Sequence, residues 1–252
     1  MVAVGGPTVV LELGGLRIVT DPTFDEPGGY RSPSGALLTK TAPAALTPDD
    51  LGPVDAVLLS HDQHQDNLDN SGRAFLQRVP LTVTTPSGAA RLPSTTRALV
   101  PWAHLDLPRP GGGSLRITAV PAQHGPPDCE SVTGEVTGFV LTSADLPTTY
   151  VSGDNASLDV VRHIAERFAP VDTAVLFAGA ARTGLFGGAL LTLDSERTAE
   201  AAKILRARRI VPAHFNSWQH FTEGGEALRE AFEQAGPTDR LVLLQPGESA
   251  TP

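Results

Sequence analysis

Cysteine is nearly absent from this chain of 252 residues, which contains only Cys129. A single cysteine excludes an intrachain disulfide and a zinc site built from several thiolates. The chain also lacks an apolar run of the roughly 20 residues that a membrane-spanning helix needs. Residues 1–7 have neither the basic start nor the apolar core of a signal peptide, so we expect a cytoplasmic protein.

Basic residues are scarce relative to acidic ones, and the formal net charge is −9. An acidic chain is a poor match for a nucleic-acid backbone, which favours a basic surface. Hydrophobic residues make up 40% and charged residues 19% of the chain, as in ordinary soluble globular proteins. We therefore expect one domain over residues 1–252 that acts on a small molecule, with no nucleic acid or membrane as partner.

Short apolar segments separated by Gly, Pro and Asp account for most of the chain. They predict strands at Thr8–Leu13, Leu16–Thr20, Asp55–Ser60, Leu81–Thr85, Leu115–Val120, Val136–Thr142, Thr149–Ser152, Thr173–Ala178, Arg209–Ala213 and Leu241–Gln245. Helical periodicity predicts helices at Asp66–Arg78, Ser157–Phe168, Ser195–Arg208 and Glu223–Gln234, with capping chemistry at Ser195. Early strands followed by mixed strands and helices indicate an α/β protein, with two sheets covered by helices.

Residues that can bind metal follow the predicted strands at five places. They are Asp21, His61, His124, Asp154 and His214. Strand ends on one edge of a layered sheet converge, and binding sites collect there. Taken singly, each has a plain structural explanation: Asp21 and Asp154 suit turns or a helix cap, and a lone histidine is more often a hydrogen-bonded structural residue. Their joint occurrence, each after a strand, favours a common site.

Residues 60–69 contain the densest group of such side chains, with two imidazoles and several carboxylates. Nitrogen and oxygen ligands suit a divalent metal such as Zn²⁺. A strongly polar surface loop is the alternative explanation for this segment alone.

Five motifs in order resemble the metallo-β-lactamase superfamily, most closely its branch of small cytoplasmic hydrolases that includes the ascorbate-phosphate lactonases. The motifs are Gly-Gly-Leu-Arg-Ile-Val-Thr-Asp-Pro (14–22), Leu-Leu-Ser-His-Asp-Gln-His-Gln-Asp-Asn (58–67), Pro-Ala-Gln-His-Gly-Pro (121–126), Tyr-Val-Ser-Gly-Asp (150–154) and Val-Pro-Ala-His-Phe (211–215). The resemblance implies a four-layer αβ/βα sandwich with metals at one edge. It also implies that His124 joins the histidines of the 61–64 segment in a first site, and that Asp66 and His214 form a second.

The resemblance assigns two further roles. Asp154 would bridge the two metal sites, and Asp21 would orient a ligand histidine from behind, as such sites commonly need.

One departure from the family's His-x-His-x-Asp-His pattern affects both sites. His64, Asp66 and Asn67 fit in register, which puts Asp62 at the first histidine; alternatively His61 is that ligand and the loop carries one extra residue. We favour His61, because it directly follows the strand. Asn67 replaces the last histidine in either alignment, and an amide is a poorer ligand, so the second site could be weak, or could recruit Asp62 or Asp69.

These residues predict a metal-dependent hydrolase, with Zn²⁺ favoured and Mn or Fe as alternatives. The metal would activate water, and Asp66 or Asp154 would accept its proton. We expect a lactone, amide or small ester as substrate and a phosphodiester as second choice, with Arg182, Trp218 and His220 near it. A mononuclear iron oxygenase and a metal-binding protein without catalysis are the competing hypotheses.

Overall fold

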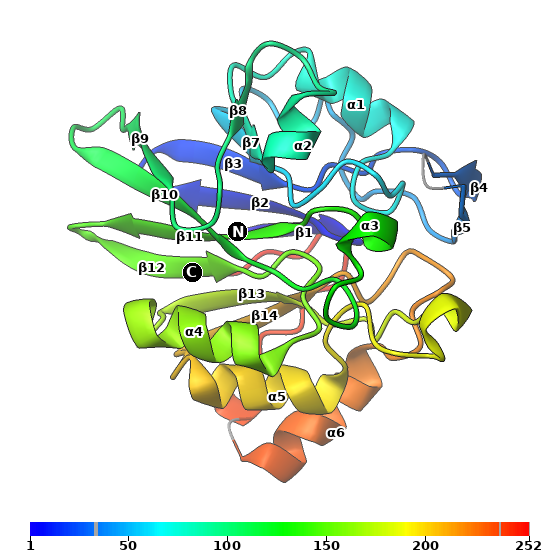
Figure 1. Cartoon of the computed structure of the whole chain (residues 1–252). Helices are drawn as coiled ribbons and strands as arrows, with labels where there is room; N and C mark the ends of the chain where they lie inside the picture. The colour runs from blue at the N-terminus through cyan, green and yellow to red at the C-terminus, as the bar shows by residue number, and fades with distance from the viewer. Residues whose placement is uncertain (33–34, 237, 252) are drawn as a thin grey trace.

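The computed structural model describes residues 1–32, 35–236 and 238–251. Within these residues, a pair of mixed sheets lies face to face (Figure 1). The first sheet contains, in spatial order, β1 (Val2–Gly5), β2 (Thr8–Leu13), β3 (Leu16–Thr20), β6 (Ala56–Leu58), β7 (Thr82–Thr84) and β8 (Thr96–Ala98). The second contains β14 (Arg209–Ala213), β13 (Thr173–Phe177), β12 (Leu146–Val151), β11 (Thr137–Ser143), β10 (Ser114–Pro121) and β9 (His104–Pro108). A separate hairpin pairs β4 (Gly28–Arg31) with β5 (Leu37–Lys40).

Helices cover the outer face of each sheet (Figure 1). Helices α1 (Asn70–Leu76) and α2 (Pro86–Ala89) lie beside the first sheet, while α4 (Leu158–Phe168), α5 (Ser195–Ile204) and α6 (Gly225–Ala235) lie beside the second. The short helix α3 (Glu130–Thr133) lies in a loop, as do the 3₁₀ turns η1 (Gly184–Phe186) and η2 (Thr238–Arg240). None of the helices in the described residues is long and apolar enough to span a bilayer.

Alternation along the strands builds three apolar layers, because successive side chains of a strand point to opposite faces. Leu11 and Phe139 meet in the core between the sheets, whereas Val10 packs with Phe75 of α1 on the outer face of the first sheet. Val140 belongs to the core between the second sheet and helices α4, α5 and α6. The predicted four-layer αβ/βα sandwich is therefore confirmed.

The predicted strand at Leu241–Gln245 is wrong. Only Leu241 forms a bridge, with Ile210, and the segment then leaves the sheet. The backbone N–H of Gln245 donates to the Glu248 side chain at 2.9 Å, so the chain turns where a strand would continue.

One helix start and one helix cap also differ from the sequence prediction. The helix predicted from Asp66 begins only at Asn70, because Asp69 caps it by accepting from the Gly72 N–H at 2.7 Å. Helix α5 begins at Ser195 as predicted, but its cap is Asp194, which accepts from the Arg197 N–H at 2.8 Å. Strands β1, β4, β5, β8 and β9 were not predicted, since they are short and largely lack a clear apolar alternation.

Candidate metal centre

The five strand-end residues lie together at one edge of the two sheets. Strands β3 and β6 run parallel, as do β12, β13 and β14, so the residues that follow them emerge on the same side. Asp21 and His214 have positive φ angles of 31° and 56°, which mark sharp turns directly after β3 and β14. Such left-handed conformations are uncommon for residues other than glycine, and they concentrate at functional sites.

Four buried or half-buried side chains form what we call the histidine cluster: His61, His64, His124 and Asp154. One ligand atom from each lies within 4.8 Å of the others. The Nδ1 atom of His64 is 2.9 Å from Nε2 of His61 and 3.3 Å from Nε2 of His124. Three imidazoles and a carboxylate thus converge on one point.

Ser60 and Asp21 hold the ring of His61 in place. Asp21 Oδ1 accepts hydrogen bonds from the backbone N–H and the hydroxyl of Ser60, at 2.8 and 2.7 Å. The Ser60 hydroxyl oxygen lies 2.9 Å from Nδ1 of His61. Since that hydroxyl donates to Asp21, Nδ1 of His61 is the donor to Ser60, which leaves Nε2 unprotonated and directed at the cluster.

The backbone of the loop at Leu191 fixes the ring of His124. Its Nδ1 lies 2.9 Å from the backbone carbonyl oxygen of Leu191, which can only accept, so Nε2 carries the lone pair that faces His64. Cys129 is buried and its thiol donates to the carbonyl oxygen of His124 at 3.2 Å, so it supports the loop that carries His124. The supporting roles of Ser60 and Leu191 were missed from the sequence; a serine before the histidine was a visible signal, and Leu191 offered none.

Burial and mutual crowding lower the pKa values of His61 and His64 and so favour their neutral forms. Burial first, and then the neighbouring His124, lower the pKa of His64 to about 4. Burial and the adjacent His64 likewise hold the pKa of His61 well below its usual range. Burial raises the pKa of Asp21 even though the bonds from Ser60 oppose this. Neutral imidazoles are the form that binds metal.

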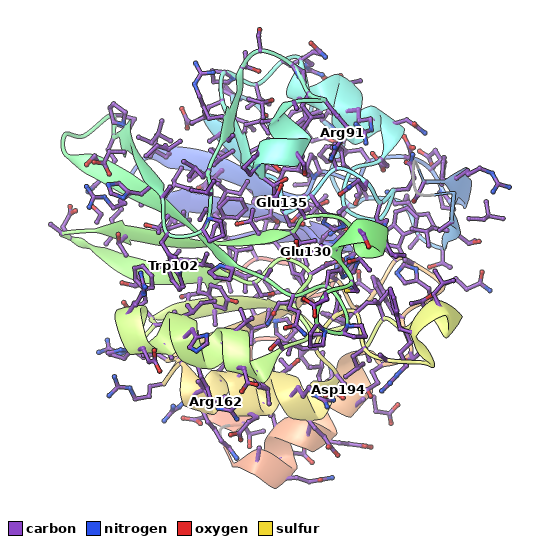
Figure 2. All side chains as sticks on the ribbon, viewed as in Figure 1. Arg91, Trp102, Glu130, Glu135, Arg162 and Asp194 are labelled. Atoms are coloured by element: carbon purple, nitrogen blue, oxygen red, sulfur yellow. The ribbon has the colours of Figure 1, made fainter. Side chains whose placement is uncertain are left out.

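Asp62 points away from the cluster. Its carboxylate accepts two hydrogen bonds from Arg91, at 2.9 and 2.5 Å, and lies 3.9 Å from Arg73. In Figure 2 Arg91 lies above Glu135, on the side that carries α1 and α2. The structure therefore places His61, and not Asp62, with the other histidines, because the arginines hold the Asp62 carboxylate elsewhere.

Asp66, His214 and His220 form a second set beside the first, which we call the Asp66 group. Oδ2 of Asp66 is 3.0 Å from Nε2 of His220 and 3.4 Å from Nε2 of His214. Asp154 lies between the two sets, with Oδ1 3.4 Å from Nε2 of His214 and Oδ2 3.5 Å from Nδ1 of His124.

The charges of the Asp66 group reinforce one another. Burial would raise the pKa of Asp66, but the His220 imidazole and the adjacent His214 outweigh it and hold that pKa well below its usual range. Burial would lower the pKa of His220, but the Asp66 carboxylate outweighs it and raises that pKa.

Asn67 is fully buried and faces Asp154 rather than the Asp66 group. Its side-chain amide donates to Oδ1 of Asp154 at 3.3 Å, and it lies 3.5 Å from the Ser60 hydroxyl. Asp69 likewise takes no part in either set, because it caps α1 and pairs with Lys40 at 3.3 Å. The Oδ1 atom of Asn67 is buried with no hydrogen-bond partner among the described residues, whereas both carboxylate oxygens of Asp69 are engaged.

A cavity of about 290 Å³ opens in front of both sets. His64, Asp66, His124, Asp154 and His220 form its polar floor. Its walls are mainly apolar and are formed by Ala36, Leu38, Val132, Thr133, Ala181, Arg182, Thr183, Leu185, Phe186 and Leu191. The cavity therefore gives a small molecule direct access to the candidate ligands.

Two residues expected near the substrate differ in their positions. Arg182 lines the cavity, and its guanidinium donates to the carbonyl oxygen of Gly188 at 2.8 Å within the glycine-rich loop. Trp218 is buried and is absent from the described cavity lining. Lys40 Nζ lies 5.6 Å from its ring centroid, and the indole nitrogen edge of the ring lies next to Gly6. Trp218 therefore lies behind the cavity rather than in its described lining, with its ring centroid 6.5 Å from that of His220.

The buried polar atoms of the site fit a metal. Oδ1 of Asp66 and both ring nitrogens of His214 are buried with no hydrogen-bond partner among the described residues. Burying unpaired polar atoms is costly, so a bound ion that engages them would remove that cost. Imidazole and carboxylate donors without thiolates suit Zn²⁺, Mn²⁺ or Fe²⁺.

Comparisons with known proteins agree with this geometry. The family model described as a beta-lactamase superfamily domain matches residues 16–215. A UPF0173 metal-dependent hydrolase of Pyrococcus furiosus is 27% identical over 206 residues, which cover 82% of this chain and 85% of that protein.

Two solved structures share the fold along almost the whole chain. The isothiocyanate hydrolase from Delia radicum gut bacteria is 26% identical, with a TM-score of 0.80 over 98% of this chain and 96% of its own. A possible metal-dependent hydrolase from Veillonella parvula is 16% identical, with a TM-score of 0.81 over the same shares of the two chains. The chain therefore belongs to the metallo-β-lactamase superfamily, and it is a metal-dependent hydrolase.

Proposed function

We propose that the protein uses Zn²⁺ to hydrolyse a small, uncharged substrate with an apolar tail and an electrophilic carbon, as in an ester, lactone, amide or isothiocyanate. The observation that carries this proposal is the cavity, whose floor holds the candidate ligands and whose walls are mainly apolar. Apolar walls favour a substrate whose burial removes apolar surface from water.

An anionic substrate fits this cavity less well. Arg182 is the one arginine or lysine among the cavity-lining residues described, and a backbone carbonyl already engages its guanidinium. Asp66 and Asp154 add negative charge to the floor. A phosphodiester would meet two carboxylates and little free positive charge, so we place it second.

A divalent metal, when bound, lowers the pKa of a coordinated water and polarises the electrophilic group. His61, His64, His124 and Asp154 would hold it, because their ligand atoms converge. Leu38, Leu185 and Phe186 would hold the apolar tail and exclude bulk water from the floor. These contacts orient the electrophilic carbon toward Asp154.

Proton transfer would fall to Asp154. Asp66 is a weak base, since its neighbours hold its pKa well below the usual range. Water adds to the electrophilic carbon, one of its protons passes through the Asp154 carboxylate to the leaving nitrogen or oxygen, and the bond from carbon to that atom breaks. With an isothiocyanate the second proton follows to the nitrogen, which leaves as the amine while the carbon leaves as carbonyl sulfide.

The relatives support the choice of substrates to test. One neighbour over nearly the whole chain is an isothiocyanate hydrolase, so an aryl-alkyl isothiocyanate is the first compound to assay. A p-nitrophenyl ester, a γ-lactone and bis(p-nitrophenyl) phosphate complete the panel. We expect turnover of at least one uncharged substrate, which stops after chelation and returns with Zn²⁺.

Exchange of His163, an exposed histidine of α4, for alanine is the matched control and should leave turnover unchanged. Faster turnover of the phosphodiester than of every uncharged substrate, or turnover without metal, would overturn the proposal. Oxygen consumption by the iron-loaded protein without hydrolysis would favour the oxygenase hypothesis instead.

A further inference from the structure

We propose that Asp62 is a positioning residue for the histidine cluster. Its ion pairs fix the turn between His61 and His64, so that both imidazoles are held ready for one zinc ion. The inference rests on the zinc-dependent function proposed above. Two residues separate the two histidines, and each residue between two ligands adds backbone freedom that is lost when both bind the same ion. A turn that is fixed in advance by its own contacts removes that cost from metal binding.

The position of the backbone matters most at His64. Its Nδ1 atom faces the cluster, 2.9 Å from Nε2 of His61 and 3.3 Å from Nε2 of His124. Nδ1 is bonded to the ring carbon that carries Cβ, so it lies nearer to the backbone than Nε2 does. The backbone at His64 must therefore approach a shared ion more closely than the backbone at the other two histidines. A small shift of the turn would move this nitrogen directly.

The two side chains between the histidines point away from the cluster. Asp62 and Gln63 line a separate surface hollow, whereas His64 lines the cavity and His61 is fully buried. Gln63 lies directly over Gly134, where the Cβ of any other residue would collide with its side-chain amide. The outward positions of these two side chains leave both imidazoles on the inner side of the turn.

Two arginines fix Asp62 on that outer side. Nε and Nη2 of Arg91 donate to Oδ2 and Oδ1 of Asp62, at 2.9 and 2.5 Å. Arg73 donates to the backbone carbonyl oxygen of Asp62, and its guanidinium lies 3.9 Å from the carboxylate. A bidentate pair fixes orientation as well as distance. Arg73 belongs to α1 and Arg91 follows α2, so the turn is attached to two separate segments of the fold.

An ion pair of the same geometry elsewhere in the chain lacks this position. Asp106 and Arg116 form a bidentate pair at 2.8 and 2.9 Å between β9 and β10, but both side chains are nearly half exposed. Exposed pairs contribute little to stability, and backbone hydrogen bonds already align these two strands. The Asp62 carboxylate is instead only 3% exposed, and residues 61–64 belong to no strand or helix. The position of this turn therefore depends on the contacts of its side chains.

The test is zinc binding to the full-length protein, stripped with a chelator and titrated with Zn²⁺ by calorimetry. In Asp62→Asn and in Arg91→Gln we expect the affinity of the tightest zinc ion to fall by about 10–100-fold, as when a partner that orients a ligand is lost. The double variant should lose little more than either single variant, because each change breaks the same pair. Arg91→Lys keeps the charge without the bidentate geometry, so its loss should be smaller. Asp106→Asn is the matched control and should bind zinc as the wild type does.

The visible absorption of the Co²⁺-loaded protein reports ligand geometry without turnover, and it should change in Asp62→Asn but not in Asp106→Asn. A purely stabilising pair would lower the urea midpoint of the metal-free protein and leave this spectrum unchanged. Zinc affinity within about threefold of wild type in a folded Asp62→Asn, with an unaltered cobalt spectrum, would overturn the inference. If Asp62→Asn does not fold, the same measurements on Arg91→Lys decide.

The proposed function and this inference fail in different ways. The expected loss of zinc affinity in Asp62→Asn, without hydrolysis of any substrate in the panel by the wild type, would support the role of Asp62 and overturn the proposed function. Absence of zinc binding in the wild type would overturn both.

Discussion

The histidine cluster and the Asp66 group lie side by side but are held in different ways. In the histidine cluster the far nitrogens of His61 and His124 are hydrogen-bonded, to Ser60 and to the carbonyl of Leu191. In the Asp66 group Nδ1 of both His214 and His220 has no such partner among the described residues. Aromatic packing against Phe177 and Phe221 orients the His214 ring instead, with centroids 5.1 and 4.6 Å away.

The difference indicates how the two sets should behave toward metal. Hydrogen bonds to the far nitrogen fix the tautomer and raise the basicity of a ligand, whereas packing fixes only the orientation of the ring. We therefore expect the histidine cluster to bind metal more tightly than the Asp66 group.

Removing a ligand of the histidine cluster should have the largest effect. In His61→Ala we expect both tight zinc binding and kcat/KM to fall by more than about 100-fold, the upper limit for loss of a supporting partner. In His220→Gln the zinc ion at the histidine cluster should remain, because His220 is not one of its candidate ligands. Elemental analysis and steady-state kinetics compare the two variants. If His61→Ala kept its tightly bound zinc ion, the histidine cluster would not be the tighter metal site.

Acid should weaken the metal-free protein through the histidine cluster. The pKa of His64 is about 4 in the folded protein against about 6.5 when unfolded, so the unfolded chain binds more protons between these values. Stability is therefore lost as pH falls from about 6.5 to about 4, by on the order of 3 kcal/mol for this residue. Urea unfolding of the metal-free protein measures the slope, which His64→Ala should flatten.

His220 should show the opposite sign. The pKa of His220 is raised in the folded protein, so its contribution is full below the unfolded value and is lost as pH rises through the folded pKa. The same urea experiment above pH 6.5 should show a fall in stability that His220→Gln removes. An identical slope in wild type and His220→Gln would contradict the pairing of His220 with Asp66.

Ser60→Ala should affect one set and spare the other. It removes the hydroxyl between Asp21 and His61, so we expect affinity at the histidine cluster to fall by about 10–100-fold. Any zinc affinity of the Asp66 group should change by no more than a few-fold. Ser143→Ala, at the end of β11, is the matched control and should change neither, as zinc titration would show.

The smallest effect concerns substrate rather than metal. Leu185 lies at the cavity wall with 76% of its surface exposed, so Leu185→Ser should raise KM by about threefold, with kcat little changed. Val100→Ser is the control, since Val100 is 56% exposed and lies outside the described cavity lining. Equal KM values in the two variants would argue against an apolar substrate tail.

Strong local patterns explain what could be predicted before the structure. The alternation in β2 and the strand-end positions of Asp21, His61 and His214 depend on neighbours in sequence, so they were visible. Leu241–Gln245 has the apolar content of a strand but leaves the sheet after one bridge, because strand formation depends on a partner that sequence does not show. Strands β8 and β9 were not predicted because they are short and offer little apolar alternation along the sequence.

By itself the sequence determined the four layers and the order in which ligand-bearing strand ends occur, because alternation and residue type act locally along the chain. Only the tertiary structure placed His61, rather than Asp62, beside the other histidines, since the position of Asp62 depends on Arg91, which is distant in sequence and holds its carboxylate away. The tertiary structure also brought His220 to Asp66 across more than half of the chain, and it placed His220 rather than Trp218 at the cavity. Asn67 was brought to the Asp154 carboxylate, to which its amide donates. Such contacts depend on how the loops of the two sheets pack against each other, and the sequence of either loop alone does not specify that packing.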